Sequence, residues 1–288
     1  VVKFQTFKAE FLVTQSASKA DYQLLSTESS ESQFHMIKNL ELTPHEHMLL
    51  KAECEAFKIC FASTGFDEAS VDFLIELGID FLKIPSGEIT NLPYLRHVGS
   101  RNMPVILSTG MATMEEVKEA LKILTSYGLR KSEITVLHCN TEYPTPFEDV
   151  NLRAMISIKE ALGVEVGYSD HTLGLEVPIA AVSMGATVIE KHFTMDRNME
   201  GPDHAASLEP HELKEMISAI RNIEKAMGDG VKKPSKSEAK NINVARRSIV
   251  ASKNIKAGEK FTEDNHAVKR PGTGISPLQW DELLGLKS

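Results

Sequence analysis

Two histidines, His171 and His192, end two consecutive apolar runs of this sequence. Imidazole nitrogens are ligands for borderline divalent ions such as manganese, iron and zinc, and Glu88 is a candidate third ligand or a partner acting through water. If the runs are neighbouring parallel strands, the two rings converge at one edge of a sheet. The alternative is that each histidine is a strand-end residue satisfied by a nearby carboxylate. Both interpretations remain open from these residues alone.

Two lysines, Lys3 and Lys83, lie on different apolar runs, and the glycines Gly87 and Gly110 follow two of the runs. Hydroxyl side chains end the same runs, namely Thr64, Ser86, Ser108, Thr109 and Ser169. A single lysine at a strand end is usually a solvated rim charge. Two lysines together with hydroxyl and backbone donors supply what a phosphate or a carboxylate requires. The cluster therefore predicts an anion site.

Four further residues have two interpretations each. Asp203 follows a Gly-Pro pair, and it either accepts hydrogen bonds from sugar hydroxyls or belongs to a plain turn. His138 follows a buried run and is assigned to packing rather than to metal ligation. Cys139 could be a nucleophile, but no neighbouring group indicates a lowered thiol pKa, so we assign it a structural role. Arg270 lies on a Gly- and Pro-rich loop that is either solvated or completes a neighbour's active site.

The elements that must position these residues alternate along the chain. Seven short runs rich in Val, Ile, Leu and Phe occupy residues 1–7, 59–64, 81–86, 105–110, 134–139, 164–170 and 188–193. Between them lie helical segments with T-x-x-E capping boxes at Thr43 and Thr113, and residues 209–227 form an amphipathic helix. Alternating strands and helices predict a parallel sheet with right-handed crossovers.

A (β/α)8 TIM barrel is the fold that these elements predict. It needs eight strands, and because the first run begins at residue 1, we expect one strand-helix unit to be missing upstream. An open doubly wound sheet is the alternative, although no G-x-G-x-x-G follows any run. The expected domains are the α/β barrel at 1–230, a linker at 231–244, and a small domain at 245–288 that is cut short at its end.

Composition excludes several classes of protein. The 288 residues are 42% hydrophobic and 25% charged, which is typical of a globular chain. A net charge of −8 gives no general attraction to nucleic acid or to an anionic membrane. Three irregularly spaced cysteines argue against a disulfide framework, and the sequence has no apolar run of about 20 residues or signal peptide. We expect a cytoplasmic protein.

Short motifs in order along the whole chain resemble those of the N-acetylneuraminate (sialic acid) synthases and their legionaminic and pseudaminic acid synthase relatives. The motifs are VKFQT at 2–6, KIPSGE at 83–88, LSTGM at 107–111, LHC at 137–139 with YP at 143–144, GYSDHT at 167–172, EKHF at 190–193, GPDH at 201–204 and VKRPG at 268–272. The family's A-E-x-G-x-N-H motif, which lies in the first strand-helix unit, is absent from this sequence.

The resemblance implies a reaction and an assembly. Members of this family condense phosphoenolpyruvate with an N-acyl amino sugar aldehyde, typically N-acetylmannosamine, to give a nine-carbon 2-keto acid and phosphate. They have a metal-dependent (β/α)8 barrel and a small antifreeze-like (SAF-type) domain, and they form a domain-swapped homodimer. The resemblance therefore implies a divalent metal cofactor, with Mn2+ the expected ion, and small-molecule substrates.

The resemblance also assigns roles to single residues. It makes His171 and His192 the metal ligands, and it places the catalytic groups at Glu88, Lys83 and these two histidines. The residues that match phosphoenolpyruvate contacts are Lys3, Thr64, Lys83, Ser86, Ser108 and Ser169. The residues that match sugar contacts are Gln5, Tyr143 and Asp203, with Arg270 donated by the partner's small domain to the N-acyl group. A further polar contact matches either Asn140 or Thr141.

The function implied first is that of an N-acetylneuraminate synthase. A legionaminic or pseudaminic acid synthase is the nearest alternative, because the acyl amino sugar cannot be identified from these motifs. More remote alternatives are a divalent-metal barrel aldolase or sugar epimerase, which would release no phosphate, and a non-catalytic carbohydrate-binding protein.

Overall fold

The computed structural model describes residues 1–20, 23–24 and 31–288 of the chain. It divides into two compact units, Val1–Met227 and Gly228–Ser288. Each unit has its own sheet, and each is described here by itself.

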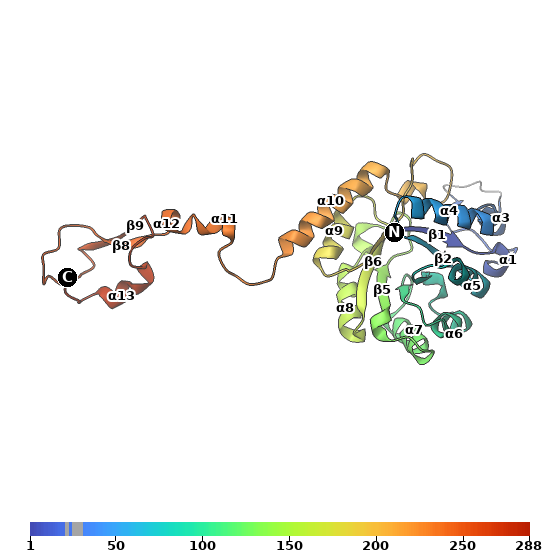
Figure 1. Cartoon of the computed structure of the whole chain (residues 1–288), viewed down its shortest axis with the longest axis horizontal. Helices are drawn as coiled ribbons and strands as arrows, with labels where there is room; N and C mark the ends of the chain where they lie inside the picture. Colours follow the sequence, from blue (N-terminus) through green and yellow to red (C-terminus); the bar gives the residue numbers. More distant parts are fainter. Residues whose placement is uncertain (21–22, 25–30) are drawn as a thin grey trace. The chain divides into compact units, whose positions relative to one another are not determined.

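Seven parallel strands form the sheet of the first unit within the described residues, in the order in which they occur along the chain (Figure 1). They are β1 (Val2–Thr6), β2 (Phe61–Gly65), β3 (Leu82–Ile84), β4 (Val105–Ser108), β5 (Ile134–Cys139), β6 (Glu165–Asp170) and β7 (Ile189–Lys191). This sequential parallel order confirms the TIM-barrel-like α/β fold predicted from the sequence. Strands β1 and β7 are the two ends of the hydrogen-bonded order.

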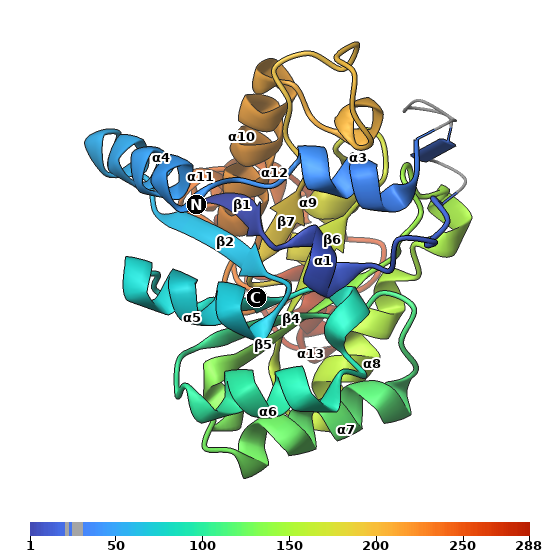
Figure 2. The same ribbon diagram turned by 90° about the vertical axis from the view of Figure 1, so that its right-hand side faces the viewer.

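Helices follow the strands and lie around the outside of the sheet (Figure 2). They are α1 (Ala9–Leu12), α3 (Gln33–Asn39), α4 (Pro44–Ala56), α5 (Glu68–Leu77), α6 (Leu92–Ser100), α7 (Met114–Ser126), α8 (Leu152–Leu162), α9 (Glu176–Ser183) and α10 (Pro210–Met227). The predicted capping boxes at Thr43 and Thr113 are both formed, and α10 matches the helix expected at 209–227. Among the described residues, no helix is both long enough and apolar enough to cross a bilayer.

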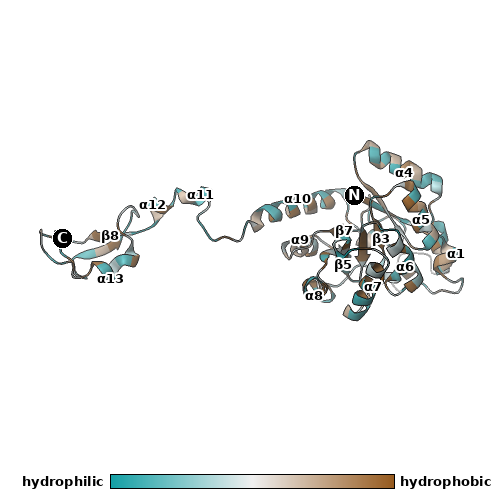
Figure 3. Ribbon diagram, turned by 60° about the horizontal axis from the view of Figure 1, so that its bottom comes forward, coloured by the Kyte–Doolittle hydropathy of each residue, from teal (hydrophilic) through white to brown (hydrophobic). Residues whose placement is uncertain are grey.

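The core of this unit lies between the sheet and the helices. Its fully buried side chains include Leu74, Leu95, Leu107, Leu124 and Met155. Figure 3 shows brown, hydrophobic residues on the strands, whereas α10 alternates between teal and brown along its length. Helix α10 is amphipathic because it buries one face, through Met216 and Ile220, and leaves the other in water.

The second unit is small and is built around one antiparallel pair of strands. Its elements are α11 (Lys236–Ala239), α12 (Ile242–Ala245), β8 (Ser248–Ala251), β9 (His266–Lys269), the 3-10 turn η5 (Pro277–Gln279) and α13 (Trp280–Leu283). The ring of His266 lies 5.2 Å from that of Phe261 and 5.1 Å from that of Trp280, measured between centroids. This aromatic group is the centre of the unit, and β8 confirms the strand predicted near residues 248–252.

Candidate active site

Polar side chains from the carboxyl ends of the strands meet inside the first unit. The parallel register explains this, because Lys3 of β1 is paired with Ala62 of β2, and Thr64 of β2 with Lys83 of β3. All carboxyl ends of a parallel sheet lie at one edge, where barrel proteins build their active sites. The residues brought together at this edge are a pair of histidines and a group of lysine and hydroxyl side chains, which is called the anion-binding group after the role that the sequence predicts for it.

Lys83 is the most deeply buried cation of the anion-binding group, with 4% of its surface exposed. Its Nζ donates hydrogen bonds to Ser108 Oγ at 2.7 Å and to the carbonyl of Ile84 at 3.2 Å. It lies 3.8 Å from a carboxylate oxygen of Glu190. Burial lowers the pKa of Lys83 to about 8, an effect that Lys3 adds to and Glu190 opposes.

Lys3 approaches the same carboxylate from the first strand. Its Nζ donates to Thr64 Oγ1 at 3.3 Å and lies 3.7 Å from Glu190 Oε2, so Glu190 lies between two lysines. Ser169 Oγ donates to the other oxygen of Glu190 at 2.8 Å. Burial would raise the pKa of Glu190, but Lys83 and Lys3 outweigh it and lower the value to about 2. The carboxylate is therefore the internal counterion of this group.

Ser86 and Gly110 form the neighbouring part of the anion-binding group. Ser86 begins the 3-10 turn η1 (Ser86–Glu88), and its Oγ accepts the backbone N–H of Gly110 at 2.9 Å. A Cβ at Gly110 would lie 2.5 Å from Thr141 Cγ2 and 2.9 Å from Ser86 Oγ, so only glycine permits this approach. Cys139 is buried with its Sγ 3.3 Å from Ser86 Oγ, an environment in keeping with a structural role.

The two histidines lie beside this group. The ring centroids of His171 and His192 are 5.3 Å apart, and the ring of Tyr143 lies 4.1 Å from His171 and 5.4 Å from His192. His171 Nδ1 is 2.5 Å from the carbonyl oxygen of Asn140, which leaves Nε2 as the nitrogen for a ligand. Burial lowers both histidine pKa values to about 4, with help from His192 on His171 and from Lys3 on His192. Both imidazoles are therefore neutral at pH 7.

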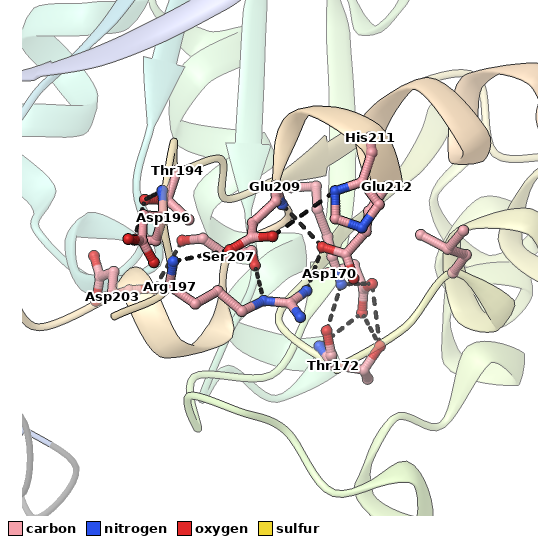
Figure 4. Close-up of polar contacts among 12 residues, drawn as sticks. Asp170, Thr172, Thr194, Asp196, Arg197, Asp203, Ser207, Glu209, His211 and Glu212 are labelled. Carbon is pink, nitrogen blue, oxygen red and sulfur yellow. Dashed lines mark hydrogen bonds and ion pairs between the residues drawn. The ribbon is translucent and has the colours of Figure 1, made fainter. Parts of the chain in front are cut away.

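The loop after β7 carries Asp203, whose Oδ2 lies 3.6 Å from His192 Nδ1. Burial raises the pKa of this carboxyl group. Polar contacts hold the loop against the start of α10 (Figure 4). Arg197 Nε donates to the carbonyl of Ser207 at 2.9 Å, and its guanidinium pairs with Glu212.

The donor set fits a divalent ion held by two protein side chains. Neutral imidazoles are the form that binds metal, and the His171 ring is oriented by a backbone carbonyl, as is usual for a metal-bound histidine. Over the described part of the chain, no three His, Cys, Asp or Glu side chains gather into a metal-ligating group. The geometry gives no support to Glu88 as a third protein ligand, and its carboxylate accepts a hydrogen bond from Asn91 at 2.5 Å.

Three other predicted residues have different surroundings. Gln5 is exposed at the end of β1, two residues beyond Lys3 on the same side of the strand. The side-chain oxygen of Asn140 accepts the N–H of Glu142 at 2.7 Å, and the backbone carbonyl of Asn140 contacts His171. Arg270 belongs to the second unit, where its Nε donates to the carbonyl of Ala245 at 2.9 Å. Its role in a partner's site stays a prediction.

Sequence reasoning gave no role to Glu190, although the structure makes it the centre of the anion-binding group. A signal was available, because residues two apart on a strand share a face and Glu190 lies two residues before His192. The partners of Glu190 could not be found in this way, since Lys3 and Lys83 lie on β1 and β3, far before β7 in the sequence.

The fold and this site define a class of protein: an α/β barrel-type protein in which two lysines and several hydroxyl groups lie beside two neutral histidines. Comparison with known proteins gives the family. The model of the NeuB family matches residues 1–232, and that of the SAF domain matches residues 246–288. The chain belongs to the NeuB family and carries a SAF domain at its C-terminal side.

Relatives of known name extend this result. The N,N'-diacetyllegionaminic acid synthase of Campylobacter jejuni is 55% identical over 284 residues, covering 99% of this chain and 85% of the relative. The enzyme of the same name from Legionella pneumophila is 47% identical over 286 residues, covering 99% and 80%. The crystal structure of an N-acetylneuraminic acid synthetase from Leptospira borgpetersenii, in complex with citrate, is 33% identical with a TM-score of 0.73, covering 83% of this chain and 78% of that one.

Proposed function

We propose that this protein is a phosphoenolpyruvate-dependent condensing enzyme that makes N,N'-diacetyllegionaminic acid. The observation that carries the proposal is the 55% identity to a synthase of that name over 99% of this chain. The relatives thus favour the legionaminic acid alternative over the N-acetylneuraminate synthase that the motifs implied first. The same identity disfavours the aldolase, epimerase and non-catalytic alternatives.

The product's chemistry defines the second substrate. A nine-carbon 2-keto acid formed with the three carbons of phosphoenolpyruvate requires a six-carbon aldehyde. The two N-acetyl groups in the product name must come from this sugar, since phosphoenolpyruvate has no nitrogen. The proposed substrate is therefore a six-carbon amino sugar with two acetamido groups, whereas N-acetylmannosamine has one.

The anion-binding group suits the phosphoenolpyruvate half of the reaction. Lys3 and Lys83 would neutralise the phosphate and carboxylate charges, and the hydroxyls of Ser86, Ser108 and Ser169 would orient them. The methylene carbon (C3) of the bound molecule attacks the aldehyde carbon to form the new C–C bond, and the aldehyde oxygen becomes a hydroxyl group. Water then adds to C2, the cationic carbon that bears the phosphate oxygen, and phosphate leaves with cleavage of this C–O bond to give the 2-keto group. Positioning and electrostatics supply most of the catalysis.

The residues around His171 and His192 would bind and activate the sugar aldehyde. A divalent ion bound by His171 and His192, with Mn2+ expected, would supply Lewis acidity toward an aldehyde oxygen. Asp203 lies beside His192 and would accept a hydrogen bond from a sugar hydroxyl. Tyr143, which packs on both rings, would form an apolar wall for the sugar carbons. The homodimer in which a partner donates Arg270 remains part of this proposal.

Phosphate release tests the proposal. The protein is incubated with phosphoenolpyruvate, Mn2+ and one sugar at a time: the six-carbon diacetamido sugar, its stereoisomers, or N-acetylmannosamine. We expect release with the diacetamido sugar, loss of release after chelation, and a nine-carbon keto acid in the mass spectrum. Faster turnover with N-acetylmannosamine would return the function to N-acetylneuraminate synthesis, and no release with any sugar would refute a condensing activity.

A further inference from the structure

We propose that a buried ion pair, Asp170–Lys191, is a positioning device that sets the spacing of His171 and His192 for a divalent cation. Glu190 pairs with Lys3 and Lys83 of the anion-binding group, whereas Asp170 and Lys191 pair with each other. The inference rests on the two-histidine site of the proposed function and adds the part of the chain that holds it.

The pair joins the ends of two adjacent strands. Asp170 ends β6 and Lys191 ends β7, and the two residues are register partners in the parallel sheet. Lys191 Nζ lies 2.5 Å from Asp170 Oδ2, with 3% and 0% of the two side chains exposed. Each partner directly precedes one of the two histidines. The ion pair therefore fixes the points from which both imidazole rings project.

Asp170 also fixes the backbone beyond His171. Its Oδ1 accepts the backbone N–H of Thr172 at 3.0 Å and the Thr172 hydroxyl at 2.9 Å, as the dashed lines in Figure 4 show. Lys191 Nζ donates a further hydrogen bond to the carbonyl of Thr172. His171 is thus held on both sides by groups tied to Lys191, the residue next to His192.

Other contacts of the histidines orient a ring and do not set the spacing between the two residues. The Asn140 carbonyl and the Tyr143 ring orient the His171 imidazole about its own side-chain bonds. The ion pair instead links the backbone at one histidine to the backbone at the other. Two-ligand sites depend on that link, because the protein has few ligands with which to correct a wrong spacing.

Energetics favour a positioning role over a stabilising one. A buried ion pair adds little stability compared with a well-packed apolar pair of the same volume, because both charges must leave water. Removing only one partner, in contrast, leaves an uncompensated buried charge. Removing both charges while keeping the acceptor for Thr172 therefore separates positioning from stability.

The test uses the double variant Asp170→Asn/Lys191→Met in the full chain, in which the Asn side-chain oxygen still accepts the N–H and the hydroxyl of Thr172. Mn2+ affinity is measured from the electron paramagnetic resonance signal of the free ion, and stability from the thermal unfolding midpoint without metal. We expect Mn2+ to bind about 10- to 100-fold more weakly, the range found for partners of metal ligands, with the midpoint close to that of the wild type. The matched control is Asp72→Asn/Arg101→Met, which removes an exposed ion pair of 2.7 Å on the outer surface and should leave Mn2+ affinity unchanged.

Two single variants keep the inference testable if the double variant folds poorly. Asp170→Asn keeps the shape and the acceptor for Thr172 but loses the charge, and we expect Mn2+ affinity to fall at least threefold. Lys191→Arg keeps the charge, so this variant should retain most of the wild-type affinity for Mn2+. Co2+ absorption bands report the geometry directly, and they should change in Asp170→Asn and not in the control.

The outcomes separate this inference from the proposed function. A folded double variant, or Asp170→Asn, that binds Mn2+ as the wild type does would overturn the positioning role while leaving the two-histidine site intact. A His171→Ala protein with undiminished Mn2+ affinity would overturn the site itself and the inference with it. Weaker binding in both Asp170 variants, with wild-type binding in the control, supports the positioning role.

Discussion

Replacing Lys83 by methionine should weaken anion binding and stabilise the fold at the same time. Methionine has a similar length and no charge, so it fills the space without leaving a cation in a site that is only 4% exposed. The pKa of Lys83 falls from 10.5 to about 8, which corresponds to about 3 kcal/mol of folding free energy at pH 7. The wild-type protein is less stable by this free energy because its buried lysine is charged at pH 7.

The pH dependence follows from the same pKa. An unfolded lysine keeps its proton up to about pH 10.5, whereas folded Lys83 loses it above about pH 8. The unfolded state therefore binds more protons between these values, and the free energy of unfolding rises with pH across this window. Lys83→Met should abolish that rise, and at pH 7 it should increase the free energy of unfolding by up to about 3 kcal/mol.

Binding should change in the opposite direction. Lys83 would supply a charge-assisted hydrogen bond to the substrate, and loss of such a bond costs about 1.5–3 kcal/mol, or about a 10- to 150-fold weaker affinity for phosphoenolpyruvate. Calorimetric titration measures the affinity. Urea unfolding at pH 7, 8, 9 and 10 measures stability by circular dichroism, because the single tryptophan, Trp280, lies in the second unit. A variant less stable than the wild type at pH 7, or one with unchanged affinity, would refute the reasoning.

Three further predictions concern Glu190, Gly110 and Thr113. Glu190→Gln removes a charge that raises the pKa of Lys83, so Lys83 should lose its proton at a lower pH than in the wild type. Sulfate binding, measured by calorimetry as a function of pH, should therefore be lost at a lower pH. An unchanged midpoint of this pH dependence would contradict the ion pair between Glu190 and Lys83. Gly110→Ala forces a Cβ against Ser86 Oγ and Thr141, and we expect a several-fold higher KM for phosphoenolpyruvate with little change in that for the sugar. Thr113→Ala removes the exposed capping box of α7 and should cost about 1 kcal/mol in urea unfolding.

The sequence predicted the fold well because parallel strands buried on both faces leave a strong local signal. Continuous apolar runs such as residues 134–139 cannot lie at a surface, and the capping boxes at Thr43 and Thr113 fix where the following helices begin. These patterns depend on neighbouring residues in the chain, so no tertiary information was needed to find them.

The site was predicted from the sequence only in part. The structure brings Lys3, Lys83 and both histidines together, as the rule that barrel sites lie at the carboxyl ends of the strands led us to expect, and their roles stay predictions. The contact of Lys3 with Glu190 joins the first and last strands of the sheet, so it depends on how the whole sheet curves. No local pattern reports that curvature, which is why Glu190 was left without a role.

Glu190 also explains how the two halves of the site are joined. It lies on β7 two residues before His192, yet its carboxylate is held by Lys3 and Lys83 from β1 and β3. If an anion bound to Lys3 and Lys83 displaces this carboxylate, the backbone of β7 next to His192 should therefore be displaced as well. In the proposed reaction, the methylene carbon of phosphoenolpyruvate and the aldehyde carbon must come within bonding distance, and a shared rigid residue between their binding groups would limit errors in that distance. Lys83, whose buried charge lowers stability, and Glu190, which stabilises that charge, would thus also register the two substrates.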